Sequence, residues 1–144
     1  MLSQPMEYEI TARTASHGIS EALCADETIR FDSSAMPASE LPGPAELLAV
    51  AFAACVLKNV ERFAEMLPFR YDTASITVRA KRQQTPPRFT EIRYELALVT
   101  DEPPDRVDLL HRNIVKQGPV FNTLAASCAV SGRIQATSPA ALAN

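Results

Sequence analysis

An alternation of apolar and polar residues opens the chain. Tyr8, Ile10 and Ala12 alternate with polar neighbours, which is the period of a strand with one buried face. The stretches Ser-His-Gly and Ala-Asp-Glu that come later are typical of turns. The pattern therefore predicts three strands, over residues 7–13, 19–25 and 28–31, with turns at 16–18 and 25–27.

The longest predicted element is a helix from Pro44 to about Met66. Pro44 suits the first helical turn, where a missing N–H costs nothing, and Pro68 is a stop signal. The half from Leu47 to Leu57 has no charge on any face, so we expect it to be enclosed on all sides. Because such enclosure is hard to build in a small monomer, a second subunit is expected to cover it.

The rest of the chain predicts a hairpin, two helices and a last strand. The hairpin strands, 76–81 and 91–98, are joined by a stretch with two prolines, which indicates a longer loop and not a tight turn. The other expected elements are a helix at 104–116, a break at Gly118-Pro119, a short helix at 120–126 and a strand at 130–136. This order favours an α+β fold.

Length and charge narrow the class of protein. The 144 residues predict a single domain, with a core over about 8–136 and a tail, 137–144, that frays. The net charge of -3 and the lack of a basic cluster argue against nucleic acid and against an anionic membrane surface. The first ten residues do not read as a secretory signal, and the apolar run from Leu47 to Leu57 is too short to span a bilayer. We therefore expect a cytoplasmic location.

The cysteines and histidines do not suggest a disulfide framework or a metal centre. Cys24, Cys55 and Cys128 are odd in number and widely spaced, and His17 and His111 are isolated. We expect both histidines to be surface or loop residues. No cofactor is expected either.

Cys55 lies on the apolar half of the long helix and has two interpretations. A free cysteine often packs as a small, buried hydrophobic residue. Reactivity would need a cation that stabilises the thiolate. Because Cys55 is in the middle of its helix, that cation would have to come from elsewhere in the fold or from a partner chain.

Two stretches carry a family pattern. GPAELLAVAFAAC, at 43–55, has a proline and a Glu-Leu-Leu step, and a small-small-Cys step about three turns later. GPVFNTL, at 118–124, matches a pattern close to Cys-Pro-Val-Ser-Asn-Thr-Leu. With this order of motifs, and with the element order from Tyr8 to Ala136, the chain resembles the OsmC/Ohr family (osmotically inducible protein C and organic hydroperoxide resistance proteins).

The resemblance implies an intertwined α+β homodimer, in which a long central helix from each chain packs against its partner and against antiparallel sheets. It also implies a peroxidase reaction. The thiolate of the central-helix cysteine attacks an organic hydroperoxide and becomes a sulfenic acid. A second cysteine then condenses with it to a disulfide, which small or lipoyl dithiols reduce.

The chain departs from this pattern in its second motif. Gly118 stands where the family has its second cysteine, and Phe121 stands in place of the serine. The two-cysteine cycle therefore cannot run as it does in the well-known members. Cys128 could take the place of the second cysteine if the segment 120–126 folds back toward Cys55, but a buried structural role is preferred for it, as it is for Cys24.

The charged residues that the resemblance implies, a glutamate and an arginine, also do not fall at the positions of the family pattern. The residue directly after the helix-opening proline is Ala45, and the glutamate comes one position later, at Glu46. Glu46 has a structural explanation, because an acidic residue in the first turn complements the helix dipole. An acid/base role, or one in orienting an arginine, is the alternative. Arg13 and Arg30 are the candidates for the arginine that supports the thiolate.

Three functions remain open at this level. The first is thiol-dependent reduction of a small apolar hydroperoxide, with Cys55 as the one reactive cysteine and an external thiol as reductant. The second is a protein of the same fold that binds a small apolar ligand at its dimer interface without catalysis. The third is a hydrolase with Cys55 as nucleophile, which would need His17 or His111 as a base.

Overall fold

The computed structural model describes residues 4–36 and 40–142. The chain divides into two compact units, Met1–Leu47 and Leu48–Asn144. Each is described by itself, and the single domain expected over residues 1–144 stays a prediction.

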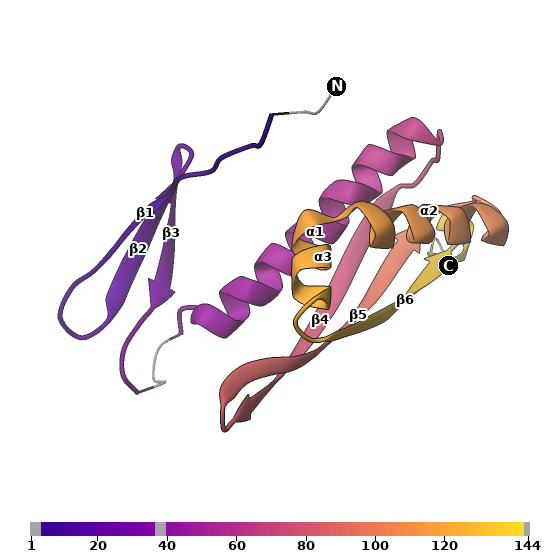
Figure 1. Cartoon of the computed structure of the whole chain (residues 1–144). Coiled ribbons are helices and arrows are strands. Elements are labelled where there is room, and N and C mark those ends of the chain that lie inside the picture. The colour runs from indigo at the N-terminus through magenta and orange to yellow at the C-terminus, as the bar shows by residue number, and fades with distance from the viewer. Residues whose placement is uncertain (1–3, 37–39, 143–144) are drawn as a thin grey trace. The chain divides into compact units, whose positions relative to one another are not determined.

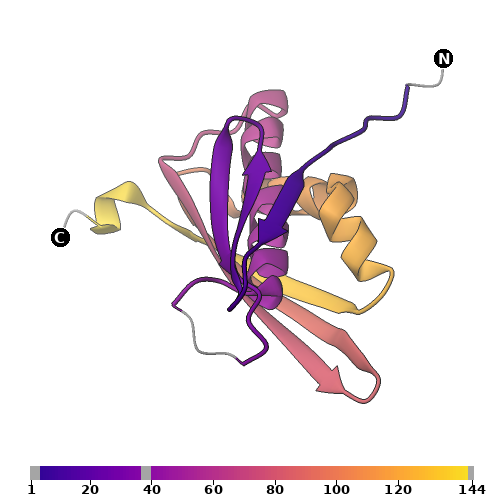
Figure 2. The same cartoon turned by 90° about the vertical axis from the view of Figure 1, so that its left-hand side faces the viewer.

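The first unit contains an antiparallel sheet of three short strands in the order β1-β2-β3 (Figure 2). The strands are β1, Thr11–Thr14, β2, Ile19–Cys24, and β3, Glu27–Asp32. Both predicted turns are confirmed, with positive φ angles at His17, Gly18 and Ala25. Gly18 has φ of 82°, and a side chain there would also overlap the backbone of Ser34, so glycine is required at this turn.

The predicted half-buried first strand is wrong in two respects. The strand begins only at Thr11, and all four of its residues are exposed. Ile10 and Leu23 are each 57% exposed, and Tyr8 is 86% exposed. The alternation predicts a face that packs against apolar partners, but among the described residues of this unit only Gly18, Ser20 and Ala22 are buried.

The long helix α1 spans Pro44–Met66, as the prolines at either end predicted. One face carries the core residues Phe52, Val56, Val60 and Phe63. Val50, on another face, is 60% exposed. The expected enclosure on all sides is therefore not met within one chain.

The sheet of the second unit has three strands in the order β4-β5-β6. They are β4, Thr73–Gln84, β5, Pro87–Val99, and β6, Ala129–Thr137. β4 and β5 are antiparallel, and β5 and β6 are parallel. The predicted α+β class is confirmed, and the sheet departs from the expected antiparallel pairing at β5 and β6, where α2 and α3 carry the chain back before β6 pairs.

The connection between β4 and β5 is shorter than predicted. The strands pair up to Gln84 and Pro87, so a tight turn at Thr85 and Pro86 replaces the expected loop over 83–88. Pro87 is compatible with a strand because it is the first residue, where a missing donor costs little.

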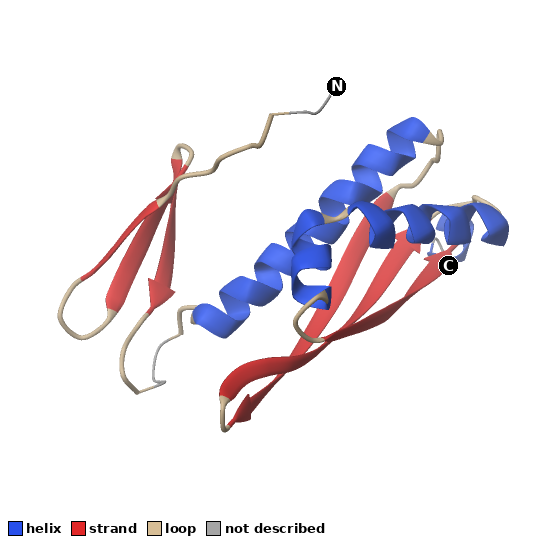
Figure 3. Ribbon diagram, viewed as in Figure 1, coloured by secondary structure: helices blue, strands red, loops and turns tan. Residues whose placement is uncertain are grey.

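Helices cover one face of this second sheet (Figures 1 and 3). α2, Pro104–Gln117, and α3, Pro119–Ala125, confirm the two predicted helices and the break at Gly118. Val107, Leu110 and Ile114 of α2 share one core with the buried residues of α1 and β5. The tail forms a short helix, α4, Pro139–Leu142, and residues 143–144 lie outside the described part.

Across residues 4–36 and 40–142, no helix is long and apolar enough to cross a membrane.

Candidate functional site

Cys55 meets the second motif through space. Its side chain is half-buried in the middle of α1, and its Sγ lies close to the corner where α2 ends and α3 begins. Gly118 is the residue at this corner, and it is buried. A β-carbon added to Gly118 would lie 3.0 Å from the Sγ of Cys55. The two stretches that carry the family pattern therefore form one site.

Asn59 is a residue of this site that the sequence did not single out. It is four residues after Cys55, on the same face of α1, and only 4% exposed. Its Nδ2 would lie 3.2 Å from the same added β-carbon, and it donates a long hydrogen bond, 3.5 Å, to the carbonyl oxygen of Ile114. An asparagine next to Lys58 looks like part of a solvated face, and only the position of α2 reveals that it is buried.

Aromatic rings form one wall of the site. Phe121, in place of the family's serine, stacks on Phe52 with 5.3 Å between ring centroids. Phe52 is one turn before Cys55 on α1. Tyr94 of β5 completes the cluster, with ring centroids 5.7 Å from Phe52 and 6.0 Å from Phe121. The surroundings of the thiol on this side are apolar.

His111 is not the surface or loop residue that we expected. It is half-buried on α2, and its Nε2 lies 2.7 Å from the hydroxyl of Tyr94. Burial lowers the pKa of His111 below its usual value, although the nearby Asp108 works in the opposite direction. Burial also raises the pKa of Tyr94. His17 lies exposed in the turn after β1.

Glu46 has a local structural role. Its Oε2 accepts a hydrogen bond of 3.2 Å from the backbone N–H of Gly43, the residue just before the helix. This is the reciprocal half of a capping box, which satisfies a donor at the helix N-terminus. Along α1, nine residues separate Glu46 from Cys55, which is roughly 13.5 Å and about half a turn around the axis. The two side chains thus leave the helix on opposite sides.

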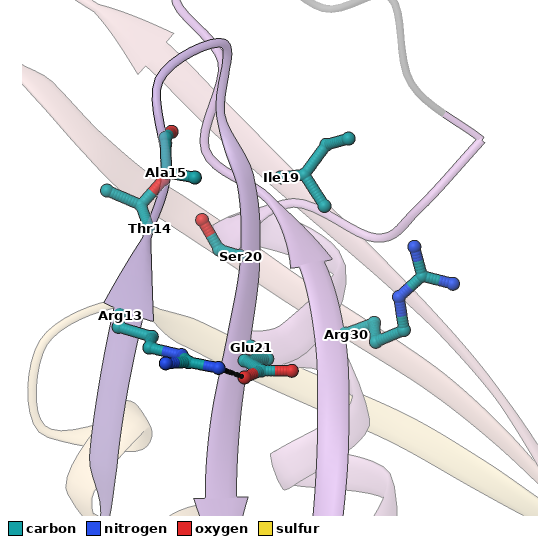
Figure 4. Close-up of a pocket in the computed structure, with 7 residues that line it drawn as sticks. All are labelled: Arg13, Thr14, Ala15, Ile19, Ser20, Glu21 and Arg30. Atoms are coloured by element: carbon teal, nitrogen blue, oxygen red, sulfur yellow. Dashed lines mark hydrogen bonds and ion pairs between the residues drawn. The ribbon is translucent and has the colours of Figure 1, made fainter.

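Arg13 lies on β1 in a pocket of about 340 Å³ in the first unit (Figure 4). Its Nε and Nη2 both contact Oε1 of Glu21, at 2.8 Å and 2.5 Å, so its guanidinium is held by a carboxylate of β2. Arg30, on β3, lines the same pocket but does not point at Glu21 (Figure 4). Arg13 therefore presents a fixed charge, and Arg30 a separate one.

The other cysteines are not joined to Cys55. All three are free thiols. The Sγ of Cys128 donates to the carbonyl oxygen of Leu124 at 3.2 Å, just after α3. The seven residues of α3 span roughly 10 Å along the helix axis, and Cys128 follows the end of this helix opposite to Gly118. Cys24 ends β2 in the other unit.

No group of three or more potential metal ligands occurs in the part of the chain that the structure describes.

Sequence comparison decides the family. The family model described as OsmC-like protein matches residues 37–132, which is more than half of the chain and includes both motifs. The chain belongs to the OsmC-like protein family. No curated protein matches it in sequence.

Solved structures share the fold of this OsmC-like chain. An OsmC-like protein from Mycoplasma pneumoniae is 19% identical with a TM-score of 0.82, over 94% of this chain and 99% of that one. An organic hydroperoxide resistance protein OsmC from Legionella pneumophila is 18% identical with a TM-score of 0.71, over 91% and 99%. The organic hydroperoxide resistance protein OhrB of Bacillus subtilis is 19% identical with a TM-score of 0.64, over 90% and 98%. At these identities the likeness establishes the fold alone.

Proposed function

We propose that this OsmC-like protein is a thiol-dependent reductase of organic hydroperoxides with Cys55 as its one reactive cysteine. The observation that carries the proposal is the contact of the Cys55 side chain with Gly118, because it brings the two family motifs together around a half-exposed thiol. The names of the Legionella and Bacillus relatives agree with this class of substrate.

The reaction has three balanced steps. The thiolate of Cys55 attacks one peroxide oxygen, the O–O bond breaks, and the alcohol leaves with the proton, so that sulfur is oxidised to a sulfenate and the peroxide is reduced. An external thiol then condenses with the sulfenic acid, which releases water and leaves a mixed disulfide. A second external thiol displaces Cys55 from it and restores the enzyme.

The apolar wall of Phe52, Phe121 and Tyr94 favours a small apolar hydroperoxide over a charged one. Arg13 is the cation that we propose for the thiolate, with Arg30 as the alternative, and Glu46 is the carboxylate that orients the arginine.

We also propose that the protein works as a homodimer. Its support is the exposed apolar surface: Val50 on α1 is 60% exposed, and Ile19 and Leu23 on β2 are 61% and 57% exposed. Size-exclusion chromatography with light scattering tests this directly. Twice the mass of one chain is expected, and a monomer at micromolar concentration would contradict it. The cytoplasmic location stays a prediction.

The activity is tested by following the loss of tert-butyl hydroperoxide in the presence of dithiothreitol. The parent protein is expected to consume the peroxide catalytically, and Cys55→Ser is expected to abolish turnover because serine is not a comparable nucleophile. Cys128→Ser is the matched control and should retain the rate. Equal rates for the parent and Cys55→Ser would overturn the proposal.

A second candidate is favoured by Gly118, which leaves the site without a second cysteine. The chain would then keep the fold and bind a small apolar ligand without catalysis. Tight binding of such a ligand that is unchanged in Cys55→Ala, together with an unreactive thiol, would favour this function.

A further inference from the structure

The site holds one polar side chain that the proposed reaction has not used. Asn59 is buried, with only 4% of its surface exposed to solvent. Among the described residues its recorded hydrogen bond is the long one from Nδ2 to Ile114, 3.5 Å, at the limit for such a bond. No buried side-chain N or O atom of the described residues lacks a partner, but Nδ2 carries two N–H groups and makes this one long bond, so an N–H is left for a further acceptor.

Asn59 and Cys55 approach the same point. A β-carbon on Gly118 would lie 3.0 Å from the Sγ of Cys55 and 3.2 Å from the Nδ2 of Asn59, so these two atoms are at most 6.2 Å apart. They are also neighbours at i and i+4 on one face of α1. An oxygen atom bonded to the Sγ on this side would come closer still to the amide.

Gly118 leaves the space between them open. Any side chain at this position would put its first carbon within van der Waals contact of both the sulfur and the amide nitrogen. Glycine here has φ of -87°, a value that any residue can adopt, so the backbone does not require it. The lack of a side chain at Gly118 therefore matters for the space between Cys55 and Asn59, and not for the backbone conformation between α2 and α3.

The chemistry of the proposed reaction supplies a use for this arrangement. A sulfenate carries negative charge on an oxygen that is held beside the apolar wall of Phe52 and Phe121. Such a charge needs a hydrogen-bond donor when it is taken out of water. Asn59 has two N–H groups on Nδ2, and of the three atoms nearest to a β-carbon built on Gly118, which are Cys55 Sγ, Phe121 Cβ and Asn59 Nδ2, the amide nitrogen is the one that carries a strong donor.

We infer that Asn59 is the donor that stabilises the sulfenate of Cys55, and that Gly118 keeps the path between them open. This inference rests on the proposed function. In place of a second cysteine that consumes the sulfenate, the chain would have an amide that preserves it until an external thiol arrives. The competing step is attack of the sulfenate on a second hydroperoxide, which breaks that O–O bond, releases a second alcohol and leaves a sulfinate. A hydrogen bond to the sulfenate oxygen slows this step by lowering its nucleophilicity.

The test is the rate of over-oxidation in Asn59→Asp and Asn59→Leu. Aspartate keeps the size of the side chain and leucine keeps its bulk, but neither can donate. Each protein is treated with tert-butyl hydroperoxide without reductant, and intact mass follows the gain of one oxygen and then of two. The second gain is expected to be roughly tenfold faster or more in both variants, as the loss of a hydrogen bond to a charged group implies.

Asn113→Asp is the matched control. The Nδ2 of Asn113 donates to the carbonyl oxygen of Leu109 at 2.9 Å on α2, and this variant should over-oxidise at the parent rate. A merely structural role of Asn59 would alter stability but not the ratio of the two oxidation rates. Over-oxidation in both Asn59 variants within about twofold of the parent would overturn the inference.

A measurement on the parent protein covers the case in which the variants do not fold. In amide NMR spectra, the side-chain Nδ2 protons of Asn59 are expected to shift strongly when one equivalent of hydroperoxide oxidises Cys55, and those of Asn113 are not. If the sulfenate forms and the resonances of the Asn59 side-chain amide do not shift, the inference about Asn59 is overturned and the proposed function is not. If the parent forms no sulfenate at all, the proposed function fails.

Discussion

Gly118→Cys should create a disulfide with Cys55. For an S–S bond of about 2.04 Å, the β-carbon of one cysteine lies roughly 3.0 Å from the sulfur of the other. The β-carbon built on Gly118 lies 3.0 Å from the Sγ of Cys55, which is this distance. A cysteine here therefore needs only a suitable rotamer to place its sulfur at bonding distance.

The expected stability change has two opposing parts. The loop that the bond closes contains roughly 60 residues, for which the loss of unfolded-state entropy corresponds to about 4 kcal/mol. The new side chain also contacts Asn59 at 3.2 Å and the β-carbon of Phe121 at 3.0 Å, and such crowding costs about 1–3 kcal/mol. Because the crowding is present in the reduced and the oxidised form alike, it cancels when the two are compared, and the oxidised variant should exceed its own reduced form by about 4 kcal/mol in unfolding free energy.

The assay combines intact mass with urea unfolding. Oxidised Gly118→Cys is expected to lose two hydrogens, and this loss should disappear in the double variant Gly118→Cys, Cys55→Ser. Gly118→Ser is the control for crowding, because it adds a side chain of similar size without a thiol. Two thiols that stay free under a mild oxidant, in a folded variant, would refute the geometry on which the site is built.

Other predictions concern stability. Glu46→Ala should lower the free energy of unfolding by about 1 kcal/mol because the capping hydrogen bond to Gly43 is lost, whereas Glu46→Gln keeps an acceptor and should lose less, as urea unfolding can check. Gly132→Ala should cost about 3 kcal/mol or more, because the added carbon would overlap the ring of Tyr94, and no destabilisation in a thermal melt would contradict this. Burial lowers the pKa of His111, so the imidazole binds a proton more readily in the unfolded chain than in the folded one. The contribution of His111 to the free energy of unfolding is therefore fully present above about pH 6.5, and it is lost as the pH falls below this value. His111→Gln should remove that part of the pH dependence, and equal pH profiles for the two proteins would show the reasoning to be wrong.

Local signals predicted the helices well. Pro44 and the approach to Pro68 bound α1, and Gly118-Pro119 separates α2 from α3, because proline and glycine act on the backbone through short-range sterics. The strand order could not be predicted in the same way. The parallel pairing of β6 with β5 depends on where the α2–α3 segment returns the chain, which is a property of packing and not of any one stretch.

The candidate site was predictable only in part. The motifs pointed to Cys55 and Gly118, and the structure adds that they touch. Asn59 and the Tyr94–His111 hydrogen bond were missed because each depends on partners that are 17 or more residues away in sequence. For Glu46 the sequence suggested an interaction with the helix dipole, and the structure adds a hydrogen bond that its carboxylate accepts from the backbone of Gly43.

The most direct test of the central claim is the intact mass of the protein after one equivalent of an organic hydroperoxide, with Cys55→Ser and Cys128→Ser in parallel. We predict the gain of one oxygen in the parent and in Cys128→Ser, and none in Cys55→Ser. A thiol at position 55 that stays unmodified in the folded protein would contradict the account and would turn attention to ligand binding.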